Sequence, residues 1–294
     1  MRRARIGTRG SALALAQARI VMDAIALVHP ELEIELCPIR TIGDVDMRPS
    51  ADVSDPQGIK GLFTLELERA LLEGEIDLAV HSLKDVPMRV DERLPIVAYA
   101  RRGDARDALV LPLGAEDLVG AIGTSSARRR AQLGALFPGR EVVPVRGNVE
   151  TRLRKLDEGQ FGALVLAVSG LARSGLAHRI SRAFSIEEMV PAAGQGILAC
   201  QGRAGDPYSY LDAVRDRGAE DCAKAERAFA SALGGGCARP VGAHASLDDA
   251  GQILTLIGFY EDGRGPRRDR IRGPREDASA LGAELADRIR SSRS

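Results

Sequence analysis

The stretch that decides the fold is Ala79–Pro87, which reads AVHSLKDVP. The mostly apolar residues Ile76–Val80 lead into it and predict a buried strand of a parallel sheet. Four polar side chains follow this strand, those of His81, Ser82, Lys84 and Asp85. Ligands of open α/β sheets bind beyond the carboxyl ends of the strands, so these side chains indicate a ligand site. An ordinary solvated turn that ends at Pro87 is the simpler interpretation of these residues by themselves.

The composition limits the classes of function. Within 294 residues, 41 basic and 41 acidic side chains give zero net charge, and aromatic residues make up only 3%. A protein that binds nucleic acid through its overall charge is basic, so we expect no nucleic-acid partner. Recognition of an anion must therefore depend on a local group of basic side chains. The chain is long enough for two or three domains with a substantial core.

The four cysteines, at positions 37, 200, 222 and 237, form neither a CxxC pair typical of metal sites nor the framework of a small disulfide-rich protein. We expect no metal, and a reduced cytosolic protein. The first residues, MRRARIGTRG, lack the apolar segment of a signal peptide. No run approaches the roughly eighteen apolar residues of a membrane span, so we expect a cytoplasmic protein without a membrane partner.

A strand, a turn and a helix recur along the chain. Ala4–Thr8 has the pattern of a strand, and Ala12–Val28 has the spacing of a helix. Ser11 is a good N-cap for this helix, and Arg9 lies in the turn before it. Free N–H groups and the positive end of a helix bind anions, so Arg9 and Ser11 are candidate binding residues.

The second unit of this kind carries the clearest anion signal. Its strand ends in a turn with three consecutive hydroxyl side chains, Thr124, Ser125 and Ser126. The helix that follows opens with three arginines, Arg128, Arg129 and Arg130. Hydroxyls at a helix start with guanidiniums beside them favour a carboxylate or phosphate. A solvated basic helix face or a nucleic-acid patch is the alternative, and the zero net charge and the lack of interleaved aromatic residues oppose the latter.

Two further units place an arginine at the same kind of turn. Val142–Val145 predicts a strand that leads into Arg146, and the next helix carries Arg152. Phe161–Val168 predicts another buried strand, and Arg173 follows it. A single such turn would be weak support for a binding site. Four of them in one chain indicate a ligand with several carboxylates or phosphates.

The order of these units predicts an α/β protein of three domains. Residues 1–99 and 197–216 form the first α/β domain, and residues 104–192 form the second. Two crossings of the chain between them, the later one at the Gly-rich segment PAAGQGI, predict a hinged clamp around a ligand. Residues 217–294 contain antiparallel strands and a closing helix, and form a small α+β domain. The polar residues 43–60 predict a flap beside the first domain.

Cys237 differs from the other cysteines because three glycines precede it. Its thiol is expected on an exposed, flexible loop, whereas Cys37 and Cys200 lie in apolar runs typical of a core. The alternative is a glycine turn that ends a helix, with an incidental cysteine. A thiol that anchors a group covalently needs no neighbouring base, so Cys237 is a candidate anchor.

Several segments together resemble one known family. They include AVHSLKDVP, GTSSARRRAQL, VRGNVETRL, PAAGQG and GGGCARPVGA, and they run in order from about residue 5 to residue 245. These segments are similar to those of porphobilinogen deaminases, which are also called hydroxymethylbilane synthases. The match is specific because the KD, SSxRR and GGGC motifs are independent of one another.

The resemblance implies an enzyme of tetrapyrrole and haem biosynthesis. This transferase would join four porphobilinogen molecules head to tail, with loss of ammonia at each step, to give the linear tetrapyrrole hydroxymethylbilane. The resemblance also implies a monomer whose first two domains are like those of periplasmic binding proteins. It implies a dipyrromethane cofactor that a thioether attaches to Cys237. Every pyrrole of the substrate carries an acetate and a propionate, which suits the predicted basic turns.

The resemblance also implies a role for each candidate residue. Asp85 is the catalytic residue, because its carboxylate can stabilise the azafulvene cation that forms when porphobilinogen loses ammonia. The cofactor-binding residues are Cys237, Lys84, Thr124, Ser125, Ser126, Arg128, Arg129 and Arg146. The substrate-binding residues are Arg9, Ser11, Lys60, Arg152 and Arg173.

Two other classes of protein share parts of this pattern. A solute-binding protein, or the effector domain of a regulator, would have the clamp and the anion turns without catalysis. The lack of an export signal and of a helix-turn-helix segment opposes both. A dinucleotide- or nucleotide-dependent enzyme would need GxGxxG or GxxxxGK[ST] at a helix start, and the sequence has neither motif there.

Overall fold

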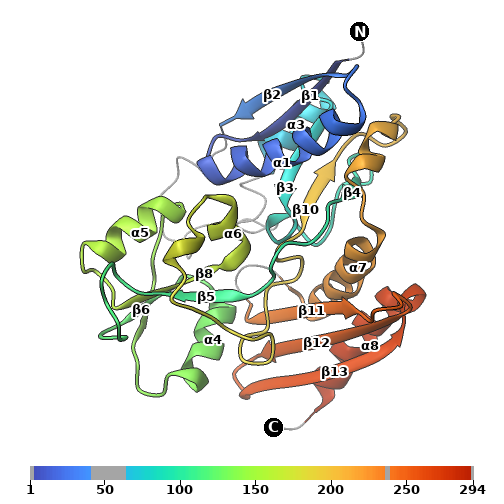
Figure 1. The fold of residues 1–294 in the computed structure, drawn as a ribbon. Helices are drawn as coiled ribbons and strands as arrows, with labels where there is room; N and C mark the ends of the chain where they lie inside the picture. Colours follow the sequence, from blue (N-terminus) through green and yellow to red (C-terminus); the bar gives the residue numbers. More distant parts are fainter. Residues whose placement is uncertain (1–2, 41–63, 236–238, 293–294) are drawn as a thin grey trace. The chain divides into compact units, whose positions relative to one another are not determined.

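The computed structural model describes residues 3–40, 64–235 and 239–292 (Figure 1). The predicted flap with Lys60 and the loop with Cys237 lie outside the described residues. Among the described helices, none combines the length and the apolar character that a membrane span requires.

Contacts between residues divide the chain into two compact units. The first consists of residues 1–103 and 197–220, and the second of residues 104–196 and 221–294. The second unit thus contains the second predicted domain together with most of the third. The three predicted domain boundaries remain predictions. The hinged clamp also remains a prediction, because it concerns motion of one unit relative to the other.

The first unit is built on a five-stranded sheet with the order β2-β1-β3-β10-β4 (Figure 1). Its strands are β1 (Arg3–Arg9), β2 (Glu33–Ile39), β3 (Leu78–Ser82), β4 (Ile96–Tyr99) and β10 (Leu198–Gln201). Strand β1 is parallel to β2 and β3, whereas β10 is antiparallel to β3 and β4. Because β1 and β3 are parallel, the turns that follow them lie at the same edge of the sheet.

Helices cover both faces of this sheet. They are α1 (Ala12–Val28) and α3 (Leu65–Leu72), with the short 3-10 helices η3 (Leu83–Asp85) and η5 (Ser209–Ala213). Ile25 of α1 belongs to the same core cluster as Leu78 of β3. Leu71 of α3 belongs to a second cluster with Ala79. Consecutive residues of a strand face opposite sides of the sheet, so α1 and α3 lie on opposite faces.

Strand β3 is shifted along the chain from the predicted range. The sequence predicts a strand that begins at Ile76, whereas β3 spans Leu78–Ser82 and includes His81. Asp77 is the residue before β3, and its carboxylate accepts the backbone N–H of Arg5 in β1 at 2.9 Å. At the other end, β10 pairs with His81 and Ser82 and so extends the strand past the last apolar residue.

The second unit contains a sheet of the same topology, with the order β7-β6-β8-β5-β9. Its strands are β5 (Asp107–Val110), β6 (Ile122–Gly123), β7 (Val142–Val143), β8 (Ala163–Ala167) and β9 (Arg182–Ala183). Its helices are α4 (Ala127–Leu136), α5 (Val149–Asp157) and α6 (Val168–Arg173), followed by the 3-10 helix η4 (Ala177–Arg179). In both sheets the strand in the fourth position is antiparallel to its neighbours. The two sheets thus share one arrangement of parallel and antiparallel strands.

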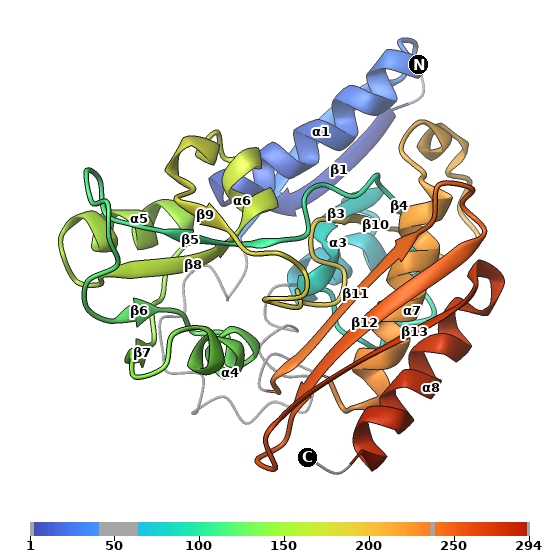
Figure 2. The same ribbon diagram turned by 60° about the horizontal axis from the view of Figure 1, so that its bottom comes forward.

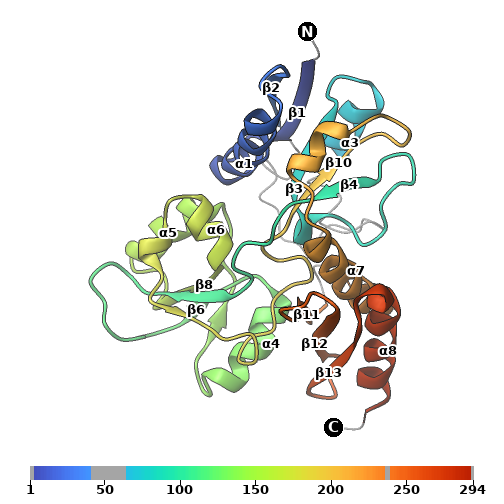
Figure 3. The same cartoon turned by 45° about the vertical axis from the view of Figure 1, so that its right-hand side comes forward.

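The remaining strands form a three-stranded antiparallel sheet. They are β11 (Val241–Leu247), β12 (Ile253–Glu261) and β13 (Pro266–Pro274), and α7 (Arg217–Ala232) and α8 (Ala278–Ser291) cover one face (Figure 2, Figure 3). Phe229 of α7 is fully buried against this sheet. It lies so close to Gly258 of β12 that a Cβ at Gly258 would be 2.5 Å from Phe229 Cζ. The predicted fold class, two α/β sheets and a small α+β portion, is confirmed.

Candidate functional site

The edge of the first sheet where β1 ends carries Arg9 and Ser11. Helix α1 begins directly after this strand, and the Ser11 side chain accepts the N–H of Ala14 at 3.3 Å. The predicted N-cap is therefore confirmed. Ile6 of β1 pairs with Leu78 of β3 in parallel register, so the residues that follow β3 lie at this same edge.

Lys84 and Asp85 lie in the 3-10 turn η3, directly after β3. Leu83 anchors this turn: its side chain is 0% exposed, and its N–H donates to the carbonyl of Ile197 at 3.0 Å. The N–H of Val86 donates to the carbonyl of Leu83 at 3.1 Å and closes the turn. Lys84 and Asp85 are both half-buried. The backbone that carries the two charged side chains is thus held on both sides.

Gln17 of α1 ties the helix to the end of β3. Its Nε2 donates to Ser82 Oγ at 2.8 Å, and Ser82 Oγ lies 3.1 Å from Gln17 Oε1. Thr8 Oγ1 of β1 donates to the carbonyl of Val80 at 3.3 Å and links β1 to β3. Gln17 is buried, and sequence reasoning missed it. Its signal was a polar residue within an otherwise apolar helix face.

His81 is buried in β3 next to the catalytic candidate. Its Nε2 lies 3.1 Å from Gln201 Oε1, and Gln201 Nε2 donates to Glu68 Oε1 and to the carbonyl of Leu94. Because Gln201 turns its oxygen toward the ring, His81 Nε2 must carry the hydrogen. Burial lowers the pKa of His81 to about 4, although Gln201 and Asp85 act in the opposite direction. The ring is therefore neutral at physiological pH and adds no charge to this edge.

In the second unit, the three hydroxyl side chains lie at the carboxyl end of β6, where α4 begins. Ser126 is the N-cap of α4 and accepts the N–H of Arg129 at 3.4 Å. Ser125 donates its hydroxyl to the carbonyl of Val145 at 2.7 Å and ties the turn to the residues after β7. Thr124 accepts the N–H of Ser126 at 3.3 Å. Within the described residues, Thr124 and Ser126 thus keep a hydroxyl hydrogen for a ligand, whereas Ser125 has donated its own.

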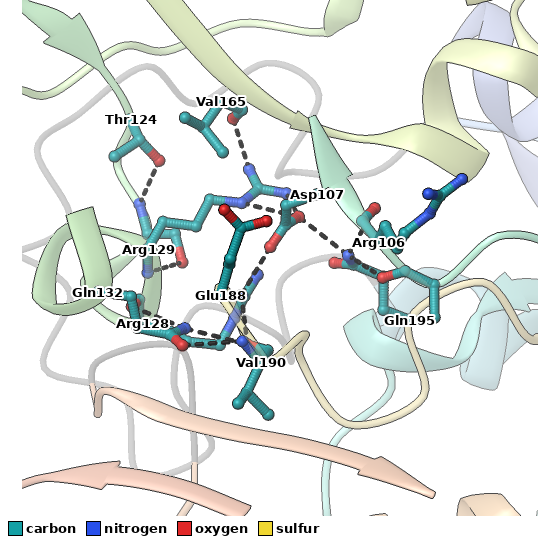
Figure 4. A network of polar contacts seen from close by, with 12 residues as sticks. Arg106, Asp107, Thr124, Arg128, Arg129, Gln132, Val165, Glu188, Val190 and Gln195 are labelled. Atoms are coloured by element: carbon teal, nitrogen blue, oxygen red, sulfur yellow. Dashed lines mark hydrogen bonds and ion pairs between the residues drawn. The ribbon is translucent and has the colours of Figure 1, made fainter. Parts of the chain in front are cut away.

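Arg128 and Arg129 converge on the carboxylate of Asp107, the first residue of β5 (Figure 4). Arg128 Nη1 donates to Asp107 Oδ2 at 2.7 Å, and Arg129 Nη2 donates to Oδ1 at 2.7 Å. All three side chains are buried. Burial acts to raise the pKa of Asp107, but the charges of Arg128 and Arg129 outweigh it and hold that pKa well below its ordinary value. Asp107 is therefore ionised, and the cluster has a net positive charge.

The segment that follows Met189 closes this cluster from another side (Figure 4). Arg128 Nη1 and Gln132 Nε2 donate to the carbonyl of Val190 at 2.8 and 3.0 Å. Gln132 Oε1 in turn accepts the N–H of Val190 at 2.8 Å. Gln195 Nε2 donates to Asp107 Oδ1 at 2.9 Å. Strand β5, helix α4 and the segment of residues 190–196 are thus joined by one buried network.

The other predicted arginines of this unit lie on separate turns. Arg173, at the end of α6, donates to the carbonyl of Gly196 at 2.5 Å, and burial lowers its pKa. Arg152 of α5 donates to the carbonyl of Gly147 at 2.7 Å. Arg146 is half-buried after β7. Whether these arginines contact one ligand remains a prediction.

Sequence reasoning missed the polar partners of the arginines, Asp107, Gln132 and Gln195. Asp107 stands at the start of the apolar run DALVLPL, and Gln195 lies between two glycines in the segment AAGQGI. A charged residue at the first position of a buried strand is a signal for a buried ion pair. That signal does not name the partner, because Arg128 is 21 residues away in the chain.

Comparison with known proteins identifies the family. Residues 4–210 match the family model "Porphobilinogen deaminase, dipyromethane cofactor binding domain", and residues 221–291 match "Porphobilinogen deaminase, C-terminal domain". The chain is 47% identical over 285 residues to the porphobilinogen deaminase of Acetivibrio thermocellus, with 96% of each chain covered. It is 43% identical over 295 residues to that of Ruminiclostridium cellulolyticum, with 100% of this chain and 99% of the relative covered. The chain belongs to the porphobilinogen deaminase family.

Proposed function

We propose that Asp85 is the catalytic carboxylate of this porphobilinogen deaminase. Membership of the family makes the chain a hydroxymethylbilane synthase, a transferase of tetrapyrrole and haem biosynthesis. The enzyme joins four porphobilinogen molecules head to tail, with loss of ammonia, into the linear tetrapyrrole hydroxymethylbilane. The observation that supports the role of Asp85 most directly is its position in η3, a turn that a fully buried Leu83 anchors at the carboxyl end of β3.

The chemistry of the substrate explains why a carboxylate is needed here. Loss of ammonia from porphobilinogen leaves a positive charge that the pyrrole ring shares. Asp85 can accept the pyrrole N–H as a hydrogen bond and oppose this charge as it forms, which stabilises the transition state more than the ground state. Because Leu83 anchors the turn η3, Asp85 needs to move little as the positive charge forms.

The carboxylates of the substrate need cations and N–H donors. In the first unit we assign this role to Arg9, Ser11 and the start of α1, because a helix N-terminus beside a guanidinium favours an anion. Lys84 binds a carboxylate and does not act as a base. In the second unit Arg152 and Arg173 are the proposed substrate-binding residues, and Lys60, outside the described residues, is a further one.

The donor set of the second unit fits the dipyrromethane cofactor of the family. The Asp107 cluster contains two guanidiniums and one carboxylate, and therefore has one surplus positive charge for an acidic ligand. When bound, the dipyrromethane supplies the pyrrole end to which the first substrate is joined. The residues proposed to hold its carboxylates are Lys84, Thr124, Ser125, Ser126, Arg128, Arg129 and Arg146. Cys237 remains the proposed site of the thioether.

We also propose that the enzyme is a cytoplasmic monomer without a nucleic-acid partner. The zero net charge supports the last point, since binding of nucleic acid through overall charge requires a basic protein. Size-exclusion chromatography with light scattering measures the mass of the particle in solution. A mass close to twice 31.3 kDa would contradict the monomer.

One experiment tests the proposed reaction. The purified protein is incubated with porphobilinogen, and ammonia and oxidised tetrapyrrole are measured over time. We expect ammonia release in proportion to the enzyme, and uroporphyrin after oxidation of the product. The Asp85→Asn variant at the same concentration is the control for chemistry that occurs without the catalytic carboxylate. Binding of porphobilinogen without release of ammonia would contradict the proposal and favour a solute-binding protein.

A further inference from the structure

We propose that Asp107 is a positioning residue: it holds Arg128 and Arg129 side by side, so that the site has a fixed surplus of positive charge before a ligand arrives. This inference rests on the proposed function, because it takes the cofactor to be the acidic ligand of this cluster. It concerns a residue that does not itself contact the ligand. Asp107 acts through the two arginines.

The geometry of the carboxylate supports this role. Asp107 Oδ1 accepts from Arg129 Nη2 at 2.7 Å, from Arg129 Nε at 3.1 Å and from Gln195 Nε2 at 2.9 Å. Its Oδ2 accepts from Arg128 Nη1 at 2.7 Å. Asp107 is 0% exposed. Charge-assisted hydrogen bonds to both oxygens leave the carboxylate a single orientation and fix both guanidinium planes.

The balance of charge shows what would happen without Asp107. Two guanidiniums side by side in a buried place repel each other, and the repulsion is strong where water is excluded. Within the described residues, Asp107 is the carboxylate that forms ion pairs with both Arg128 and Arg129. It compensates one positive charge and leaves the other. The cluster therefore attracts an anion through one uncompensated charge, and this charge destabilises the folded protein less than two would.

The donors that remain are suited to a carboxylate. Among the described residues, Arg128 makes hydrogen bonds only through Nη1, to Asp107 and to the carbonyl of Val190. Its Nε and Nη2 are therefore left for a ligand. Thr124 and Ser126 keep their hydroxyl hydrogens at the start of the same helix. Asp107 and Val190 determine which way these Arg128 donors face.

The experiment measures loading of the cofactor and not only activity. Wild type and the variants Asp107→Asn and Asp107→Glu are made in a cell-free system that supplies no porphobilinogen. Each is then mixed with porphobilinogen, and the gain of two substrate units less two ammonia is followed by intact-protein mass spectrometry. The matched control is Asp157→Asn, which removes the charge from another ion-paired aspartate of the same unit, the partner of Arg179. Thermal unfolding of each protein separates loading from stability.

We expect both Asp107 variants to gain the mass at least about tenfold more slowly than wild type, because misplaced guanidiniums lose charge-assisted hydrogen bonds to the ligand. Asp107→Glu tests position apart from charge, since it keeps the carboxylate and moves it by one methylene. Asp157→Asn should unfold at a lower temperature and load at the wild-type rate.

The outcomes separate this inference from the proposed function. Loading at the wild-type rate in a folded Asp107 variant, or equally slow loading in Asp157→Asn, overturns the positioning role. If only Asp107→Glu folds, its rate of cofactor loading alone tests the positioning role. If neither variant folds, Asp107 is required for the protein to fold, and the proposed positioning role is wrong. A wild type that never gains the mass contradicts the proposed function itself.

Discussion

The carboxylate of Glu226 accepts the backbone N–H of Gly194 at 2.7 Å and so joins helix α7 to the segment that follows Met189. Its other oxygen accepts the N–H of Ala245 on β11, also at 2.7 Å. Glu226 is 0% exposed, so both oxygens satisfy backbone donors in the interior. One carboxylate therefore connects three segments of the second unit.

Replacement of this carboxylate should lower stability. Glu226→Ala leaves two buried backbone N–H groups without their acceptors, and each such group costs about 1–3 kcal/mol. We expect the free energy of unfolding to fall by about 3 kcal/mol in urea titrations. The control is Glu284→Ala, at an exposed position of α8, for which we expect a change below about 0.5 kcal/mol. Similar changes in the free energy of unfolding for the two variants would show that the Glu226 carboxylate does not stabilise the fold in this way.

A second prediction separates chemistry from folding at Asp85. Asp85→Asn keeps the shape of the side chain and removes its charge, so we expect kcat for ammonia release to fall about a hundredfold or more. The unfolding temperature should change little, since Asp85 is only half-buried. Asp23→Asn, at an exposed position of α1, is the control. A near-normal kcat in Asp85→Asn would exclude this carboxylate as the stabiliser of the cation.

The three consecutive arginines of α4 should differ in their effects. Arg128 and Arg129 are buried beside Asp107, whereas Arg130 is exposed. We expect Arg128→Leu or Arg129→Leu to lower cofactor content and raise KM about tenfold or more, because charge-assisted hydrogen bonds are lost. Arg130→Leu is the matched control and should stay close to wild type. Equal kinetic constants in all three variants would contradict the assignment.

Stability should depend on pH through His81. Burial lowers the pKa of His81 from 6.5 to about 4, so the unfolded chain takes up a proton at a pH where the folded protein does not. The contribution of the neutral ring is complete above pH 6.5 and is lost as the pH falls toward about 4. The loss should reach about 3 kcal/mol, measured by urea unfolding across this range. His81→Gln should lack this part of the pH dependence, and identical profiles would refute it.

The last prediction concerns the attachment of the cofactor. The loaded protein should exceed its sequence mass by two porphobilinogen units less two ammonia, and Cys237→Ser should lose this extra mass. Variants of the other cysteines should retain it. Cys200 and Cys222 are buried, and burial raises the pKa of Cys200 to about 12, which keeps its thiol unreactive. A modification that stays on Cys237→Ala in intact-protein mass spectrometry would place the attachment elsewhere.

Features that depend on neighbours in the chain could be predicted from the sequence alone. Helix α1 spans Ala12–Val28 as predicted, and Ser11 caps it. Asn148 likewise accepts the N–H of Thr151 at 2.8 Å at the start of α5. A cap bonds a residue two or three positions away, and helical spacing repeats within one turn. Asp85 lies in a turn, and Arg9, the last residue of β1, lies just before one, so both candidate site residues were recognisable from local patterns.

The partners of the buried polar groups were decided by the tertiary structure. Gln195 reaches Asp107 across 88 residues, and Gln201 reaches His81 across 120. No local pattern connects such residues, because strand pairing and burial bring them together. In water each of these groups would be solvated by itself, and only the closed interior makes a partner obligatory. The sequence alone therefore indicates where charge gathers, and the fold determines which charges are compensated and which remain for a ligand.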